Sequence, residues 1–473
     1  MMDSLLSIYH RLPTPLRSLA ASVRGYQLRS WRYGPETERL IEEAVEREQW
    51  GEARWRAWQE EKLARILHRA ATRVPYYREY WASRRSKGDQ ASWERLENWP
   101  ILEKEPVRQN AQAFIAEDVD IRRMRSEQTS GTTGKPLRLW SSTETVRAWY
   151  ALFEARSRHW YGVSRRNRWA MLGGQLVTPI RRRTPPFWVW NVALNQLYMS
   201  SYHLAPDLIT FYLDAIKRYR IRYIYGYTSS IYSLAQEALR LGRKELHLAV
   251  VITNAEPVFG YQRDAITEAF QCPVKETYGM SEIVMAASEC ESESLHLWPE
   301  AGWLEVFEQG EPVPYGQMGD LVCTGLLNPD MPLIRYRVGD RGALSQTNMP
   351  CECGRTLPML GSIEGRIDDV LYTADGRRIG RLDPVFKTSL PLREAQIIQE
   401  RLDQVRVKYV PAPEFTTDAE RLITERLQER MGFVKVILEQ VDEVPRTSNG
   451  KFRAVISNIS GTPDDCFKSA ARR

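Results

Sequence analysis

The segment that gathers the most chemically useful residues is Ser126–Pro136, a run of hydroxyl side chains with two glycines and one lysine. Gly131 and Gly134 permit backbone angles closed to other residues, so successive N–H groups can converge on an anion. Lys135 adds positive charge beside them. The hydroxyl groups that complete the pattern belong to Thr129, Ser130, Thr132 and Thr133. The pattern predicts a phosphate-binding loop, and a plain polar turn is the alternative.

The spacing of this loop argues against a P-loop NTPase. Only two residues separate Gly131 from Gly134, and Pro136 follows the lysine. A Walker loop has the form G-x-x-x-x-G-K-[ST].

Four further motifs follow along the chain: Glu276–Glu282, Ile334–Gly342, Gly365–Asp369 and Pro445–Arg453. In this order and spacing, the five motifs resemble those of the adenylate-forming superfamily of acyl-CoA synthetases. The resemblance spans roughly residues 95 to 457. The compact layout is most similar to the phenylacetate:coenzyme A ligase branch, including its capsule-biosynthesis relatives. This resemblance implies an enzyme that uses ATP to join a carboxylic acid to AMP.

Joining a carboxylate to AMP brings two anions together, so cations and hydrogen-bond donors must offset their repulsion. Glu282 suits Mg²⁺, which prefers few protein carboxylates together with phosphate oxygens and water. The resemblance implies that Lys451 is the adenylation lysine, that Arg366 helps to hold the phosphates, and that Asp340 accepts from both ribose hydroxyls. By composition alone, Lys451 would be a surface lysine in a polar turn.

The resemblance assigns other residues to the nucleotide. Tyr278 and Gly279 lie along the adenine, and Ser281 lies near the α-phosphate. Arg378 matches a further arginine, although the loop Thr373–Gly376 is one residue longer than in some relatives.

A second stretch matches a Gly-Ala-Glu-Pro segment that lines the adenine in phenylacetate ligases. Its counterparts here are Ala255, Glu256 and Pro257, while Asn254 stands where the relatives have glycine. Asn tolerates left-handed backbone angles better than most residues, so a nucleotide contact stays compatible with this change.

The acyl pocket is expected at Tyr225, Gly226 and Tyr227, where relatives build part of it. Two aromatic side chains favour an aryl or other apolar acid, although buried aromatics are also ordinary core residues. Asp368 matches the hinge about which the small domain of the superfamily rotates between its two half-reactions. A plain turn is the alternative at that position.

Four metal-binding side chains suggest a structural zinc ion. Cys351 and Cys353 share one tight turn, and Cys290 with His296 follows the Glu276–Glu282 motif. Three thiolates and one imidazole supply the four ligands of tetrahedral Zn²⁺. Buried thiols without metal are the alternative, and the remaining cysteines, Cys272, Cys323 and Cys466, are not expected to be ligands.

The composition limits the class of protein. The chain has 473 residues, 43% of them hydrophobic and 27% charged, with a net charge of +6. This modest basic excess favours nucleotides and does not indicate nucleic-acid binding. Six cysteines without a disulfide pattern favour a reducing compartment, and therefore the cytoplasm. No apolar run is long enough to predict a transmembrane helix.

The elements that must position these residues follow from hydrophobic periodicity. Apolar residues at three- and four-residue steps predict packed helices in residues 1–95. Short β-rich runs alternate with helical patterns in residues 96–364, which predicts an α/β adenylation core with mainly parallel sheets. A small, mobile α+β domain follows at 365–457, and residues 458–473 form a flexible tail. The basic, amphipathic start of the chain is expected either to dock as a terminal helix or to contact a membrane surface weakly.

The function expected from these features is ATP-dependent adenylation of an aryl or other apolar acid, followed by thioester formation with CoA. One alternative is acyl transfer to an amine, a sugar or a carrier-protein thiol. Another is a non-catalytic nucleotide-binding assembly protein, which would have no use for a mobile lysine. The sequence does not indicate an oligomeric state.

Overall fold

The structure is a computed structural model that describes residues 8–128, 137–179, 182–345, 351–366, 371–372, 378–379, 385, 390–432, 434–446 and 452–459. The phosphate loop from Thr129 to Pro136, the hinge residue Asp368 and Lys451 lie outside the described residues. The backbones of Arg366 and Arg378 are described, but their side chains are not.

The N-terminal part is helical, as its periodicity predicts. On α4 (Glu52–Arg73), Trp55, Leu63 and Ile66 are buried on one face, with charged residues on the other. The other helices of this part are α2 (Thr14–Arg32), α3 (Thr37–Arg47), α5 (Pro75–Ser86) and α6 (Lys104–Gln109). A hairpin of β1 (Arg125–Gln128) and β2 (Arg138–Ser141) follows, and its two strands flank residues 129–136.

One 13-stranded sheet forms the centre of the molecule, in the order β12-β11-β13-β14-β15-β10-β9-β8-β7-β6-β3-β5-β4. Its first strands are β3 (Trp169–Gly173), β4 (Trp188–Asn191), β5 (Gln196–Ser200), β6 (Tyr223–Tyr227), β7 (Val250–Asn254) and β8 (Val274–Gly279). The remaining strands are β9 (Ala286–Glu289), β10 (Leu295–Leu297), β11 (Gly302–Glu308), β12 (Glu311–Pro312), β13 (Gly319–Gly325), β14 (Tyr336–Leu344) and β15 (Met359–Arg366).

The direction of the strands divides this sheet into two halves. Strands β5, β3, β6, β7 and β8 are parallel, because helices connect most of them. From β8 onward every pairing is antiparallel, and β4 is an antiparallel edge. The α/β class is confirmed, whereas the expectation of mainly parallel sheets is correct for only one half, since the later strands are joined by short turns rather than by helices.

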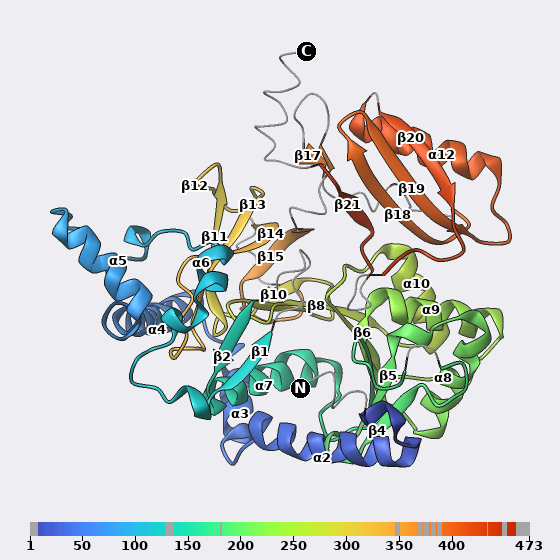
Figure 1. The fold of residues 1–473 in the computed structure, drawn as a ribbon, viewed down its shortest axis with the longest axis horizontal. Coiled ribbons are helices and arrows are strands. Elements are labelled where there is room, and N and C mark those ends of the chain that lie inside the picture. Colours follow the sequence, from blue (N-terminus) through green and yellow to red (C-terminus); the bar gives the residue numbers. More distant parts are fainter. Residues whose placement is uncertain are drawn as a thin grey trace.

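Three helices cover the parallel half: α8 (Pro206–Arg218), α9 (Thr228–Arg240) and α10 (Gly260–Phe270) (Figure 1). Their apolar faces and those of the strands form a core that includes Tyr212, Ile224 and Phe270. A separate core joins α4 and α5 to the antiparallel half. Helix α7 (Thr143–Ser157) packs against α3 and lies beside the central strands.

A small α+β unit follows the central sheet and lies over α9 and α10 in Figure 1. Its four-stranded sheet has the order β20-β19-β18-β21. The elements are β16 (Leu371–Tyr372), β17 (Arg378–Ile379), β18 (Leu392–Arg401), β19 (Gln404–Pro411), α12 (Thr417–Met431), β20 (Lys435–Gln440) and β21 (Val455–Ser457). Ile397, Val407 and Leu427 belong to a core of its own. None of the helices within the described ranges has the length and apolar character needed to cross a bilayer.

Candidate active site

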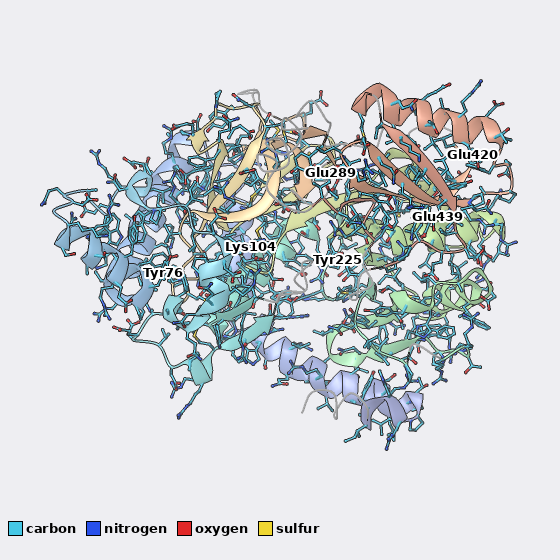
Figure 2. The ribbon with its side chains drawn as sticks, turned by 45° about the horizontal axis from the view of Figure 1, so that its top comes forward. Tyr76, Lys104, Tyr225, Glu289, Glu420 and Glu439 are labelled. Carbon is cyan, nitrogen blue, oxygen red and sulfur yellow. The ribbon has the colours of Figure 1, made fainter. Side chains whose placement is uncertain are left out.

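A cavity of about 2090 Å³ lies where the helical part, the central sheet and the small domain meet. Small-molecule sites usually measure about 300–1,000 Å³, so this cavity has room for more than one ligand. Figure 2 marks Tyr225, from β6, near the middle of the molecule. The cavity walls include eleven of the residues predicted from the sequence: Tyr225, Tyr227, Ala255, Glu256, Pro257, Tyr278, Gly279, Ser281, Glu282, Asp340 and the predicted metal ligand Cys351.

The two strands that flank the predicted phosphate loop also reach this cavity. Arg125 and Glu127 of β1, with Leu137 and Ser141 on the β2 side, belong to its walls. Gln128 pairs with Arg138, so the loop joins two adjacent antiparallel strands. The ends of the loop are therefore fixed at the cavity.

Tyrosine hydroxyls hold the two predicted carboxylates in place. The Tyr278 hydroxyl donates to Asp340 Oδ2 at 2.6 Å, and the Tyr336 hydroxyl donates to Glu282 Oε1 at 2.9 Å. Gly339, at φ +85°, turns the backbone just before Asp340. The two hydroxyl groups thereby fix the orientation of both carboxylates in the cavity wall.

The two arginines predicted to contact the phosphates lie in different sheets of the structure. Arg366 ends β15, and its Cα lies opposite Asp340 of β14 in the antiparallel register. Arg378 opens β17, which pairs only with β16. The backbone thus places Arg366 directly beside a cavity residue.

The residue directly after Lys451 contacts the predicted adenine segment. The backbone N–H of Phe452 donates to Glu256 Oε1 at 2.7 Å. Glu256 also accepts from the Ser229 N–H at 2.8 Å and from the Ser229 hydroxyl at 3.1 Å. Only 8% of Glu256 is exposed. Its burial raises its pKa, and the donors of Ser229 and Phe452 partly oppose that rise. Glu256 therefore joins the small domain to α9 at the edge of the cavity.

The segment from Asn254 to Pro257 differs in one respect from the sequence expectation. Asn254 is the last residue of β7, and the left-handed residue is Ala255, at φ +62°. The tolerance of Asn for left-handed angles is therefore not what this segment needs. An alanine in that region costs about 1–2 kcal/mol.

The predicted acyl-pocket residues have two different roles. Tyr225 and Tyr227 line the cavity, and burial raises the pKa of Tyr225 to about 12. Gly226 does not line it: a Cβ at this position would lie 2.2 Å from the Leu172 carbonyl oxygen of the neighbouring strand β3. Strand packing thus requires glycine at position 226, and its assignment to the acyl pocket stays a prediction.

Several cavity residues escaped the sequence analysis. Lys104 lies at the start of α6, and its Nζ is 5.9 Å from the centre of the Tyr336 ring. It lines the same cavity as Glu282 and Asp340. Glu276 lines the cavity, and burial, together with the nearby charge of Glu289, raises its pKa to about 7. Lys104 lies in no recognisable motif, and the burial of Glu276 depends on strands distant in sequence.

The four predicted metal ligands lie together, with their ligand atoms within 4.8 Å of one another. Cys290 Sγ lies 3.7 Å from Cys351 Sγ, and Cys353 Sγ lies 3.4 Å from His296 Nε2. A tetrahedral Zn²⁺ ion separates two sulfurs by about 3.8 Å, and a sulfur from a nitrogen by about 3.6 Å. The cluster therefore fits zinc.

The surroundings of the cluster act on its ligands in two directions, because burial raises the pKa of the Cys290 and Cys353 thiols. His296 Nδ1 lies 2.9 Å from the Leu357 carbonyl oxygen, so its N–H can donate a hydrogen bond there. That tautomer leaves the Nε2 lone pair for a metal ion. Burial raises the pKa of the Cys351 thiol, but hydrogen bonds, among them those from Ser294 and His296, outweigh it and lower this pKa to about 6. Cys272 and Cys323 are buried elsewhere, and Cys466 lies outside the described residues.

Comparisons with known proteins agree with this fold and cavity. Residues 371–458 match the family model of the CapK C-terminal domain. The chain is 24% identical to "Protein CapK" of Staphylococcus aureus, over 96% of this chain and 99% of that protein. It is 26% identical to a phenylacetate-coenzyme A ligase of Thermus thermophilus, over 90% of this chain and 99% of that protein.

Solved structures show the same fold. A crystal structure of 2-hydroxyisobutyryl-CoA ligase in its postadenylation state has a TM-score of 0.66 and 22% identity, covering 90% of this chain and 93% of that chain. The same ligase in its thioesterification state, with equal coverage, has a TM-score of 0.51.

The fold, the cavity and these relatives define an adenylate-forming protein of the acyl-CoA synthetase superfamily, whose members include AMP-forming acid:CoA ligases. Within that superfamily, the chain is similar over most of its length to phenylacetate:coenzyme A ligases and to CapK.

Proposed function

We propose that the protein adenylates an aryl or other apolar carboxylic acid with ATP and then transfers the acyl group to CoA. In the first step, a carboxylate oxygen attacks the α-phosphorus, the bond to the β-phosphate breaks, and pyrophosphate leaves. In the second step, the CoA thiol loses its proton, sulfur attacks the acyl carbon, and AMP leaves. Atoms and charges balance with ATP, acid and CoA alone.

The observation that carries this proposal is the bond from the Phe452 N–H to Glu256. It brings the backbone next to Lys451 to the edge of the cavity that contains Tyr278, Glu282 and Asp340. Lys451 would then reach the meeting point of carboxylate and α-phosphate, where a cation lowers the barrier most. The higher TM-score to the postadenylation state supports an arrangement suited to the first half-reaction.

The remaining residues would support this chemistry by position. Glu282, oriented by Tyr336, would hold Mg²⁺, which supplies charge neutralisation at the phosphates. Asp340, oriented by Tyr278, would accept from the ribose. Lys104 would add a second cation on the same side of the cavity.

The aromatic wall around Tyr225 supports an aryl or apolar acid. The Phe153 ring meets Tyr225 edge to face, with ring centres 5.4 Å apart, and Trp149 and Tyr198 also line the cavity. Such rings bury a flat apolar group well. The cluster of Cys290, His296, Cys351 and Cys353 would hold a structural zinc ion that ties β10 to the loop before β15.

An acyl acceptor other than CoA is the second candidate, because residues 371–458 of the small domain match the CapK family model. The small domain approaches the cavity, and therefore its surface would also meet the acceptor. An amine, a sugar or a carrier-protein thiol would replace CoA in the second step only.

The test is pyrophosphate release from ATP and Mg²⁺ with a panel of aryl, fatty and amino acids, each with and without CoA. Release with one acid that accelerates on addition of CoA is the expected result. Release at the same rate with and without CoA would indicate that another molecule is the acyl acceptor. No release with any acid would instead favour a non-catalytic nucleotide-binding protein.

A further inference from the structure

The outward face of α2 carries a concentration of exposed apolar side chains. Ten large apolar residues are exposed in the described part of the chain, and five of them lie between residues 8 and 26. The most exposed of the five is Val23, at 64%. These five residues are Ile8, Leu16, Leu19, Val23 and Tyr26. Val192 adjoins them, because its N–H donates to Ser22 Oγ of α2 at 3.1 Å, and it is exposed too.

The exposed residues of α2 form a stripe. At 100° per residue, the steps of three, four and three from Leu16 to Tyr26 keep their side chains within an arc of about 80°. A contiguous apolar patch on a protein surface marks an interaction site more often than single exposed residues do.

The opposite face of α2 is fully engaged with the protein. Arg17 is buried and donates to Thr178 Oγ1 at 2.6 Å. A Cβ at Gly25 would lie 2.1 Å from Asn191 Oδ1, so the helix lies close against β4. Ala21 and Leu28 line the cavity. The stripe is therefore not needed to hold α2 in place, and α2 lies along the rim of the molecule in Figure 1.

The charge around the stripe has one sign. Residues 4–35 contain five arginines and no aspartate or glutamate. Arg11 and Arg29 are exposed, whereas Arg17 is buried and Arg24 and Arg32 belong to the cavity walls. An apolar stripe flanked by arginines is the pattern of a helix that lies in the interface of an anionic bilayer.

We propose that the stripe of α2 rests on an anionic lipid surface, with Leu16, Leu19, Val23 and Tyr26 among the acyl chains and Arg11 and Arg29 at the headgroups. A second copy of the chain is a less favourable occupant. Pairing two such stripes would bring like-charged arginines together, and neither helix has an acidic residue to offset them.

This proposal goes beyond the proposed chemistry and does not depend on it. The inner face of the same helix lines the cavity. A helix with its side chains is about 10–12 Å across, so a docked α2 would hold the cavity at about that distance from the lipid. An acid or an acyl acceptor at the membrane would then be within reach.

The experiment is sedimentation of the full chain with vesicles of phosphatidylglycerol and phosphatidylcholine in equal amounts, and with vesicles of phosphatidylcholine alone. Wild-type protein is expected to sediment with the first at low salt and to dissociate as salt rises. Leu19→Ser with Val23→Ser should weaken this binding roughly tenfold or more. Arg11→Gln with Arg29→Gln should weaken it by roughly tenfold as well.

The matched control is Tyr315→Ser, which removes an exposed aromatic residue far from α2 in sequence and should leave binding within about twofold of the wild type. Thermal melting establishes that each variant is folded. The proposal is overturned by no sedimentation, by equal binding to neutral vesicles, or by equal binding of the Leu19/Val23 variant. It is also overturned if lipid-free protein is a dimer that the Leu19/Val23 variant dissociates, because the stripe would then be a contact between two copies.

Discussion

Replacing Glu256 with glutamine is expected to slow adenylation while sparing thioester formation. Glu256 Oε1 accepts from Phe452 N–H and from the Ser229 hydroxyl, and Oε2 accepts from the Ser229 N–H. An amide places an NH₂ group at one of these two positions, so one donor always faces another donor. The bond to Phe452 also loses its ionic character.

The magnitude follows from the contact that is lost. A hydrogen bond to a charged group contributes about 1.5–3 kcal/mol. If that free energy stabilises the orientation of the small domain seen here, its loss lowers the adenylation rate roughly 10- to 150-fold. If the small domain leaves this orientation for the second half-reaction, the bond breaks there, and the thioester half-reaction should not change.

The assay measures the two half-reactions separately. Exchange of labelled pyrophosphate into ATP reports adenylation, and a synthetic acyl-adenylate with CoA reports thioester formation. Ser229→Ala is the control, because it removes a 3.1 Å hydroxyl contact to Glu256 and leaves the Phe452 bond intact. Equal losses in both half-reactions of the Glu256→Gln variant would refute the reasoning, as would a Ser229→Ala variant that behaves like it.

Three further predictions concern other parts of the site. Lys451→Ala should lower pyrophosphate release by at least about 100-fold with little change in ATP binding by calorimetry, and near-wild-type release would refute its role. Metal analysis should find about one zinc atom per chain in the purified protein. A protein with Cys351→Ser and Cys353→Ser should lose the metal and melt at a lower temperature. An unchanged zinc content and melting temperature would contradict the proposed zinc site. Glu276 has a pKa raised from 4.5 to about 7, so ionising it disfavours the folded state. The free energy of unfolding should therefore fall by up to about 3 kcal/mol as pH rises from 4.5 through 7, and Glu276→Gln should flatten this dependence in denaturant titrations; an unchanged slope would argue against it.

The sequence predicted the local features of the site better than the distant ones. The motif Glu276–Glu282 lies on and after β8, and its predicted residues Tyr278 and Glu282 both line the cavity, because they are only four residues apart in the chain. The grouping of Cys290, His296, Cys351 and Cys353 was also predicted, since cysteine and histidine are few and distinctive, and its occupation by zinc stays a prediction.

Contacts between segments far apart in sequence were not predictable in the same way. Nothing in the local pattern of Ser229 indicates that it anchors Glu256. Gly226 looked like part of a pocket motif, but its role depends on the separation of β6 and β3. The antiparallel half of the sheet was missed because short apolar runs show strand propensity without showing strand direction.

The position of β8 has a consequence for engineering. This strand is hydrogen-bonded to β7 in parallel and to β9 in antiparallel register, so neither of its edges is free to move. The face that carries Tyr278 is thus held from both sides. By contrast, Ala21 and Leu28 reach the same cavity from α2, which packs on the periphery of the sheet beside β4. Variants with a new acid preference are therefore best sought on α2, where side-chain volume can change while the nucleotide-binding strand stays in place.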